Sequence, residues 1–351
     1  RYMKLVEIIL SNKTDTHLIP PMAEFLEETL GKGVVYAKDT PNFIANRIGV
    51  YGMMVTLDEA RKKNLSIEDV DSLTGTLIGR PKSATFRTSD IVGLDTMCFV
   101  AKTAYEKCIE DPEKDIFKIP DYIQKMVDNK WLGQKSNQGF YKKIDKGVIH
   151  SIDLDSLEYA PQNKKRYTGV RLAKENTRPG DRIKALVNSD DTAGKFIWEG
   201  SSKALLYSAS RLGEIADDLL NIDRALRWGF GWELGPFEVW DAIGVSESIA
   251  RMKAENKTIP NWVLNMLDKG HKTFYKHMDG LSCYWDINKE DYLPIPTSPK
   301  ELHFANFKYN GSLIHDHWSA SMVDLGDEVA GVDLHSVLKA DFNPIDGSIL
   351  Q

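Results

Sequence analysis

The sequence contains few cysteines and no long apolar run. Its 351 residues include only Cys98, Cys108 and Cys283, which are too few and too scattered for a disulfide framework or a zinc site. We expect reduced thiols that pack as small hydrophobic side chains. No stretch approaches the length that a bilayer-spanning helix needs, and nothing at the start resembles a signal peptide. These absences predict a cytoplasmic protein that does not span a membrane.

An excess of positive charge is also missing. The net charge of −6 gives no electrostatic reason to expect binding to nucleic acid or to an anionic membrane. The eight histidines lack metal-ligand spacing, although His315 and His317 lie two residues apart. The glycine run at 229–235 has its third glycine one place late for a dinucleotide loop and follows a helical pattern, so it predicts a helix-to-helix corner.

The first forty residues predict one strand–helix–strand unit. Residues 4–10 are almost continuously apolar, as in a strand that is covered on both faces. A helix is predicted at 14–30, and a second short strand at 34–37. Such a unit belongs to a parallel sheet, which two strands cannot form stably alone. We therefore expect the rest of the sheet upstream of Arg1 or on another chain.

After Pro41 the pattern becomes helical, which makes the predicted fold class mainly α with an α/β start. A long helix is predicted from about Asn42 to Lys63, with a buried face formed by Ile44, Ile48, Tyr51 and Val55. Ser66 is a predicted cap for the next helix. Further helices are predicted at 94–108, 120–130 and 203–220. The polar stretch at 145–188 predicts a connector or hairpin.

An internal repeat divides this helical part. Phe86, Asp90 and Gly93 align with Phe237, Asp241 and Gly244, and Gly139-Phe140-Tyr141 aligns loosely with Thr273-Phe274-Tyr275. Segments 119–122 and 259–262 also correspond in order and spacing. A tandem duplication explains the agreement, with one unit at 41–150, a connector at 151–188 and a second unit at 189–300.

Three polar residues could carry chemistry. Glu7 places a carboxylate in an apolar strand, where it could orient a catalytic histidine or could simply lie in water at the strand end. Asn46 lies at a helix start and could donate to a carbonyl or an anion, or could act as a local cap. Lys135 lies in a glycine-bounded loop and could reach a phosphate, although a solvated lysine is the default reading.

Two segments together resemble the signature of the 3-hydroxyacyl-CoA dehydrogenase family. These are Met3-Lys4-Leu5-Val6-Glu7-Ile8-Ile9 and Lys38-Asp39-Thr40-Pro41-Asn42-Phe43-Ile44-Ala45-Asn46-Arg47. The loop at 133–141 and the segment Gly235-Pro236-Phe237-Glu238 with Asp241 are similar to two further motifs of the family. The resemblance implies a Rossmann domain that binds NAD and ends at 1–40, and a duplicated helical domain that closes over acyl-CoA.

The resemblance also implies roles for single residues. Glu7 matches the glutamate that pairs with a catalytic histidine, and Asn46 matches the asparagine beside the 3-oxygen of the substrate. Lys135 matches a lysine near the cofactor. Asn42 stands where many members have glycine, so we expect an unstrained backbone there or a positive φ that asparagine tolerates. The histidine and the glycine-rich NAD loop are expected upstream of Arg1.

The end of the chain carries a second resemblance. Residues 322–335 predict a hairpin that turns at Gly326-Asp327. Residues 325–330 and Asn343-Pro344-Ile345-Asp346 resemble the opening of an enoyl-CoA hydratase (crotonase) domain, so 301–351 is predicted to be a linker and the first hairpin of that domain. This implies a β-oxidation enzyme with two fused activities, and both ends of the chain look cut.

Three hypotheses remain open at this point. The first is an (S)-3-hydroxyacyl-CoA dehydrogenase that uses NAD and acyl-CoA and forms a homodimer through its helical domains. The second is a catalytically empty helical module that dimerises or acts as a scaffold, because tandem helical repeats are common at subunit interfaces. The third is a related Rossmann dehydrogenase of another hydroxy acid.

Overall fold

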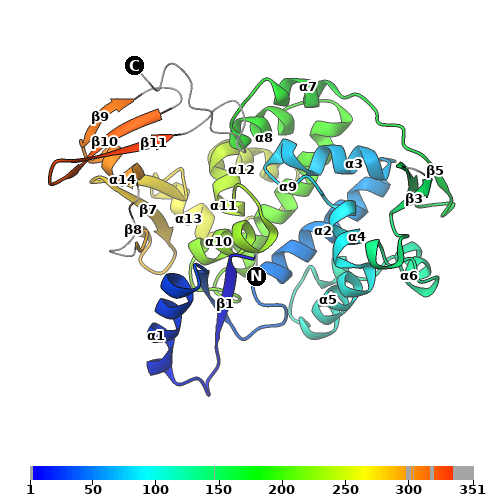
Figure 1. Ribbon diagram of the computed structural model, residues 1–351, viewed down its shortest axis with the longest axis horizontal. Coiled ribbons are helices and arrows are strands. Elements are labelled where there is room, and N and C mark those ends of the chain that lie inside the picture. The colour runs from blue at the N-terminus through cyan, green and yellow to red at the C-terminus, as the bar shows by residue number, and fades with distance from the viewer. Residues whose placement is uncertain (1–2, 146, 298–301, 303, 317–319, 335–351) are drawn as a thin grey trace.

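The computed structural model describes residues 3–145, 147–297, 302, 304–316 and 320–334. Along the chain it contains a two-stranded parallel sheet with one helical crossover, two helical repeats that each end in a small antiparallel sheet, and a C-terminal three-stranded sheet. Figure 1 shows the helices of the two repeats packed side by side (cyan and green), with the C-terminal strands (orange and red) at the upper left.

The strand–helix–strand unit is present as predicted. Strands β1 (Leu5–Leu10) and β2 (Gly33–Lys38) pair in parallel, with Glu7 opposite Val35. Between them lie a 3-10 turn at Thr16–Leu18, helix α1 (Ile19–Glu24) and a π-helical turn at Phe25–Thr29.

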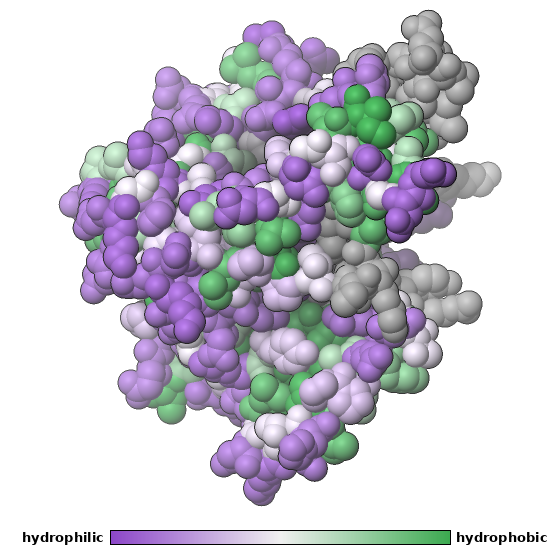
Figure 2. Space-filling view, turned by 90° about the vertical axis from the view of Figure 1, so that its left-hand side faces the viewer, coloured by the Kyte–Doolittle hydropathy of each residue, from purple (hydrophilic) through white to green (hydrophobic). Residues whose placement is uncertain are grey.

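The prediction that both faces of the first strand are covered was wrong. Most of β1 is half-buried, because within the described residues β2 is its only paired strand. The apolar stripe of the crossover is also exposed, with Met22 and Phe25 each about half accessible. Figure 2 shows apolar side chains mixed with polar ones on the lower part of this side of the molecule, where α1 lies.

The two repeats have the same order of elements. Repeat 1 consists of α2 (Ala45–Lys62), α3 (Ile67–Thr74), α4 (Phe86–Val92), α5 (Leu94–Lys107), α6 (Asp121–Asp128) and the sheet of β3 (Tyr141–Asp145), β4 (Val148–Ile152) and β5 (Tyr159–Pro161). Repeat 2 consists of α9 (Thr192–Arg211), α10 (Leu219–Phe230), α11 (Pro236–Ile243), α12 (Val245–Ala254), α13 (Asn261–Asp268) and the sheet of β6 (Tyr275–Met278), β7 (Leu281–Asp286) and β8 (Asp291–Pro294). The two units thus share one order of helices followed by a three-stranded sheet, as a duplication would produce.

Equivalent buried aspartates hold each repeat together. In repeat 1, the Asp90 carboxylate accepts hydrogen bonds from the backbone N–H groups of Phe140 (2.8 Å) and Tyr141 (2.9 Å). In repeat 2, Asp241 accepts from the N–H groups of Phe274 (2.7 Å) and Tyr275 (2.9 Å). The aspartate of the repeated Phe–Asp–Gly pattern thus joins a helix to the first strand of the small sheet by hydrogen bonds.

A second pair of aspartates completes this arrangement. Asp71 accepts from the Phe86 N–H (2.7 Å) and from the Tyr141 hydroxyl (2.8 Å). Asp223 accepts from the Phe237 N–H (2.9 Å) and from the Tyr275 hydroxyl (2.9 Å) in the same way. Each carboxylate caps the start of a helix, α4 or α11, and at the same time binds the tyrosine of the strand.

Two helix predictions need correction. The stretch at 145–188, predicted as a connector or hairpin, contains β4 and β5 and also the helices α7 (Thr168–Lys174) and α8 (Pro179–Val187). These helices are too short for a clear period, but Ile183 and Leu186 of α8 are buried against repeat 2. The helix predicted at 203–220 is broken, because Leu212 is extended and Asp218 caps a new helix through the Asn221 N–H.

The long first helix begins later than predicted. It starts at Ala45 because Asn42 and Phe43 have φ values of +67° and +52°, which a right-handed helix does not allow. The expectation that Asn42 would use its tolerance of positive φ is confirmed. The predicted apolar face is also confirmed, since Ile44, Ile48 and Tyr51 are buried.

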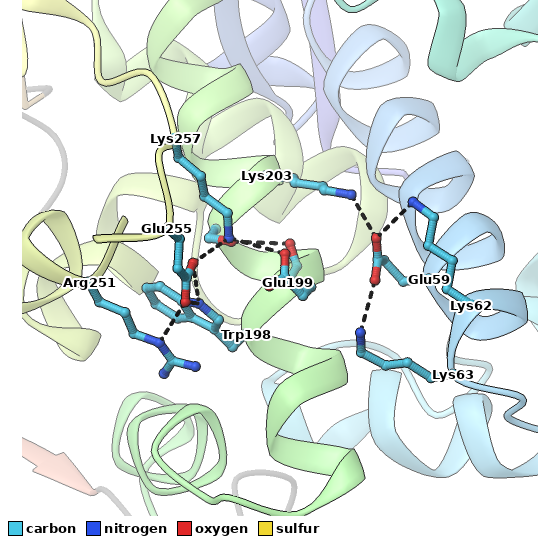
Figure 3. Close-up of polar contacts among 10 residues, drawn as sticks. Glu59, Lys62, Lys63, Trp198, Glu199, Lys203, Arg251, Glu255 and Lys257 are labelled. Carbon is cyan, nitrogen blue, oxygen red and sulfur yellow. Dashed lines mark hydrogen bonds and ion pairs between the residues drawn. The ribbon is translucent and has the colours of Figure 1, made fainter. Parts of the chain in front are cut away.

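Helices α2 and α9 pack against each other and join the repeats (Figure 1). The rings of Tyr51 and Tyr207 stack with centroids 3.7 Å apart. Farther along, the buried Glu59 of α2 pairs with Lys203 of α9 (2.7 Å) and with Lys63 (3.2 Å), as Figure 3 shows. Glu59 is only 3% exposed, whereas the side chains of Lys203 and Lys63 are 29% and 23% exposed, so the cluster extends from the seam to the surface.

The C-terminal sheet contains a hairpin at the predicted place, but it turns at Asp327-Glu328, one residue later than predicted, because Gly326 still belongs to the strand. The sheet consists of β9 (Leu313–Asp316), β10 (Ala320–Gly326) and β11 (Val329–Leu334), preceded by α14 (Phe304–Tyr309). His317 and the 343–346 segment lie outside the described residues. Within the described ranges, no helix combines the length and apolarity that crossing a bilayer requires, and no group of three or more potential ligands is arranged for a metal.

Asp90→Asn should show an effect on stability that decreases with rising pH. Burial raises the pKa of Asp90 to about 6 although two backbone N–H groups oppose it. A raised native pKa stabilises the fold below the unfolded pKa, and this contribution is lost as pH rises through 6. The difference in unfolding free energy between wild type and variant should therefore fall by about 2–3 kcal/mol between pH 4 and 7 in urea titrations. A difference that grows with pH would contradict this; the exposed Asp128→Asn variant is the control.

Glu59→Gln should show the opposite trend. Burial raises the pKa of Glu59, but Lys203 and Lys63 outweigh it and lower the pKa to about 2. A lowered native pKa stabilises the fold above the unfolded pKa, and this contribution disappears as pH falls toward 2. The variant should lose about 2–3 kcal/mol of unfolding free energy at pH 7 and approach the wild type near pH 2. Glu106→Gln, which removes an exposed partner of Lys102, is the control and should change little; a pH-independent loss in Glu59→Gln would show that only packing matters there.

Candidate active site

Glu7 lies within β1 and its carboxylate reaches the start of α2. One carboxylate oxygen accepts from the Ile44 N–H at 2.9 Å and the other from the Ala45 N–H at 3.2 Å. Burial raises the pKa of Glu7, and these two bonds act against that increase. Glu7 is thus not a strand-end glutamate in water. Because a carboxylate has about four acceptor positions, two remain for another donor.

Asn46 follows directly in the first turn of α2. It is exposed, and its side-chain amide has no hydrogen-bond partner among the described residues. The amide lines a cavity of about 290 Å³ that lies between the start of β1, α2, the loop before α4 and the end of α10. Asn46 therefore places a polar group without a described partner at the N-terminus of α2, beside a cavity that a ligand can occupy.

The cavity combines apolar walls with a few polar groups. Its apolar side chains are Met3, Met53, Val92, Phe230 and Trp232, and its polar ones besides Asn46 are Arg80, Ser83, Thr85 and Thr88. Such a lining is typical of small-molecule sites, where apolar contacts provide affinity and a few polar groups orient the ligand. Sequence reasoning did not identify Arg80 or Trp232 as part of a site.

The structure places Lys135 elsewhere in repeat 1. It lies in a 3-10 turn at Gln134–Ser136, and its ammonium pairs with Asp95 at the start of α5. Both side chains are more than 40% exposed, so the pair contributes little to stability. Lys135 does not line the cavity of Asn46. The predicted cofactor lysine and the two predicted catalytic residues are therefore not brought into one cluster by the described residues.

Arg47, next to Asn46, is a residue that sequence reasoning missed. It is fully buried and pairs with Asp111 (2.7 Å), and it donates to the Tyr207 hydroxyl (2.5 Å) and to the Cys108 sulfur (2.5 Å). The sequence could have indicated it, because Arg47 places a positive charge on the apolar helix face that Ile44 and Tyr51 define. Because Tyr207 belongs to α9, this network ties the start of α2, and hence Asn46, to repeat 2.

The glycine run at 229–235 forms the predicted helix corner. α10 ends at Phe230, Gly231 has a φ of +67°, and α11 begins at Pro236. Among the described residues, no glycine-rich turn links a strand to a helix in the way that a dinucleotide loop requires. The described residues therefore do not provide a dinucleotide loop for the pyrophosphate of NAD.

A larger cavity of about 860 Å³ lies beside repeat 2, between α10, β7 and Lys4. Its acidic residues are already engaged: Asp223 and Asp241 bind backbone N–H groups, and Glu238 pairs with Arg227 at 2.9 Å. It contains neither Glu7 nor Asn46. We therefore locate the candidate site at the smaller cavity, which Asn46 lines; Glu7 does not line it but binds the N–H groups of the two residues before Asn46.

Comparison with known proteins finds relatives of one kind. Residues 43–143 match the family model for the C-terminal domain of 3-hydroxyacyl-CoA dehydrogenase. A Bacillus subtilis protein named "Probable 3-hydroxyacyl-CoA dehydrogenase" is 47% identical over 336 residues, which are 96% of this chain and 42% of that protein. A Deinococcus radiodurans protein of the same name is 45% identical over 41% of this chain and 40% of its own length.

A mammalian relative extends the comparison. The mitochondrial hydroxyacyl-coenzyme A dehydrogenase of Rattus norvegicus is 36% identical over 40% of this chain and 43% of its own length. The chain thus spans about two-fifths of the length of the curated relatives it matches. Residues 43–143 therefore match the C-terminal domain of the 3-hydroxyacyl-CoA dehydrogenase family, and 96% of the chain is similar to a protein named as a probable enzyme of this kind.

Proposed function

We propose that this chain forms the substrate-binding part of an NAD-dependent (S)-3-hydroxyacyl-CoA dehydrogenase. The observation that carries the proposal is the contact of the Glu7 carboxylate with the first turn of α2, one residue before the unpartnered Asn46. The carboxylate thereby binds the helix start from which the Asn46 amide reaches a largely apolar cavity. The names of the relatives support the reaction class.

In the proposed mechanism, each residue acts through its own hydrogen-bonding groups. The Asn46 amide donates to the 3-oxygen of the substrate and holds it at the mouth of the cavity. Glu7 accepts from a histidine that takes the proton of the 3-hydroxyl, and its negative charge stabilises the imidazolium that forms. NAD, if bound, would supply the hydride acceptor for this oxidation. Lys135 is proposed to approach the cofactor, as an alternative to its pair with Asp95.

The assignment of Glu7 has a physical basis in its surroundings. The carboxylate is partly removed from water and is held by two N–H groups at a helix start. These bonds fix the direction of the two remaining acceptor positions, and a fixed acceptor selects the tautomer and orientation of a histidine partner. The positive end of the α2 dipole also favours the ionised carboxylate.

Three wider features of the protein belong to the same proposal. We propose a fused enoyl-CoA hydratase (crotonase) activity, supported by the β10–β11 hairpin that contains the 325–330 resemblance. We also propose a homodimer that forms through the helical repeats, and a cytoplasmic location. The scaffold hypothesis remains the alternative: a folded full-length protein that does not form NADH from any 3-hydroxyacyl-CoA would favour it.

Glu7→Gln in the full-length protein should reduce kcat roughly 100-fold, the scale of a lost acid–base partner. Glutamine keeps the size of the side chain but loses its charge and one acceptor for the α2 N–H groups. The reaction is followed by NADH formation from (S)-3-hydroxybutyryl-CoA. The exposed Glu27→Gln variant should retain full activity. Wild-type turnover in Glu7→Gln would remove Glu7 from the mechanism.

Asn46→Ala should lower kcat/KM by roughly 10- to 100-fold, the scale of about 1.5–3 kcal/mol for a hydrogen bond to developing charge. The unfolding midpoint in urea should stay within the range of surface substitutions, since Asn46 has no partner among the described residues. Asn265→Ala, on the exposed face of α13, is the matched control. A drop in stability as large as the drop in activity would indicate a structural role for Asn46.

A further inference from the structure

Arg80 and Trp232 occupy equivalent positions in the two repeats. Each follows a glycine with the same left-handed backbone, Gly79 (φ +67°, ψ +32°) and Gly231 (φ +67°, ψ +31°). The two loops meet, since the Glu233 N–H donates to the Gly79 carbonyl at 2.7 Å. The Arg80 guanidinium lies over the Trp232 ring, 4.1 Å from its centroid. The duplicated position has therefore become a cation in one repeat and its aromatic partner in the other.

This cation has no anionic partner. Within the described residues, no carboxylate lies within 4.0 Å of the Arg80 guanidinium. The neighbouring Glu233 pairs with Arg182 instead, at 3.8 Å. Burial, without any compensating charge, lowers the pKa of Arg80 to about 10. Arg80 is thus half-buried, positively charged and uncompensated.

The environment of Arg80 explains why a ligand would supply the missing charge. Arg80 lines the same cavity as Asn46, and the other polar side chains there, Ser83, Thr85 and Thr88, are neutral. Partly buried charges are normally paired, because removing them from water is costly. A guanidinium stacked on an aromatic face keeps its N–H donors free in the plane of the group, where carboxylates and phosphates bind it in a bidentate manner.

We propose that Arg80 binds an oxyanion of the ligand in the Asn46 cavity, so that this site selects acyl thioesters that present a negative charge there. The proposal rests on the proposed function for the acyl thioester and on the cavity geometry for the anion. Two sources share this chemistry: a carboxylate at the far end of the acyl chain, and a phosphate of CoA. Arg80 acts on specificity and not on proton transfer.

Calorimetric titration of the full-length protein with three probes tests the proposal. Valeryl-pantetheine is neutral. Glutaryl-pantetheine has the same acyl chain length and one terminal carboxylate. Valeryl-CoA has no terminal carboxylate, and its negative charge lies on the phosphates of CoA. The wild type should bind at least one charged probe roughly 10- to 100-fold more tightly than the neutral probe, the range for hydrogen bonds to charged groups. The probe that is preferred identifies the source of the anion.

Arg80→Met keeps an apolar stem on the Trp232 ring but removes the charge. It should abolish the preference for the charged probe while leaving the affinity for valeryl-pantetheine within about twofold, and Arg80→Lys should restore part of the preference. Lys82→Met removes a nearby exposed charge that does not line the cavity, and should preserve the preference. If Lys82→Met also lost the preference for the charged probe, the preference would come from the overall positive charge of the surface and not from Arg80, and the proposal would be overturned.

Two further outcomes would also overturn the proposal. If Arg80→Met bound all three probes more weakly by the same factor, Arg80 would have only the structural role of packing on Trp232. If the wild type bound the charged probes no more tightly than the neutral probe, Arg80 would not bind an oxyanion of the ligand. Because binding requires no hydride transfer, these outcomes are separate from a failure of the dehydrogenase proposal, which the Glu7→Gln turnover measures.

Discussion

The buried guanidinium of Arg47 is the constraint on which the candidate site depends. It joins α2 to Asp111 of repeat 1 and to Tyr207 of repeat 2, and all three side chains are almost inaccessible. Removing either charge would leave the other buried with only a longer ion pair, Arg47 to Glu214 at 3.3 Å or Asp111 to Arg211 at 3.6 Å, so the start of α2 has little freedom to shift. From the opposite side, Glu7 binds the first N–H groups of the same helix. Asn46 lies between these two anchors, which explains how an exposed side chain can have a defined position.

The two repeats show how a duplicated unit can keep its framework and change its surface. The buried aspartates recur with the same backbone and tyrosine partners, because each closes a helix onto a strand and cannot be exchanged without leaving N–H groups unsatisfied. The loops after Gly79 and Gly231 keep their backbone but carry Arg80 and Trp232. This divergence occurs where the repeats face each other, so that one cavity receives a different side chain from each repeat.

Much of the architecture was predictable because it depends on local pattern and on the repeat. The strand–helix–strand start, the apolar face of α2, the Ser66 cap, the hairpin of β10 and β11 and the helix corner at 229–235 follow from periodicity and turn residues. The short helices α7 and α8 and the break at Leu212 were not predictable in this way. Their residues are buried by contacts with helices distant in sequence, which no local period records.

The sequence by itself determined that Glu7 and Asn46 are exceptional, since a carboxylate in an apolar strand and an amide at a helix start stand out by residue type alone. Only the tertiary structure decided that they meet at one helix start, that Lys135 pairs with Asp95 away from them, and that Arg80 enters the same cavity without a counter-ion. The physical reason is that burial and pairing of charges depend on distances between segments far apart in the chain. The type of a residue shows whether it requires a hydrogen-bond or charge partner when it is buried, whereas the fold determines which residue that partner is.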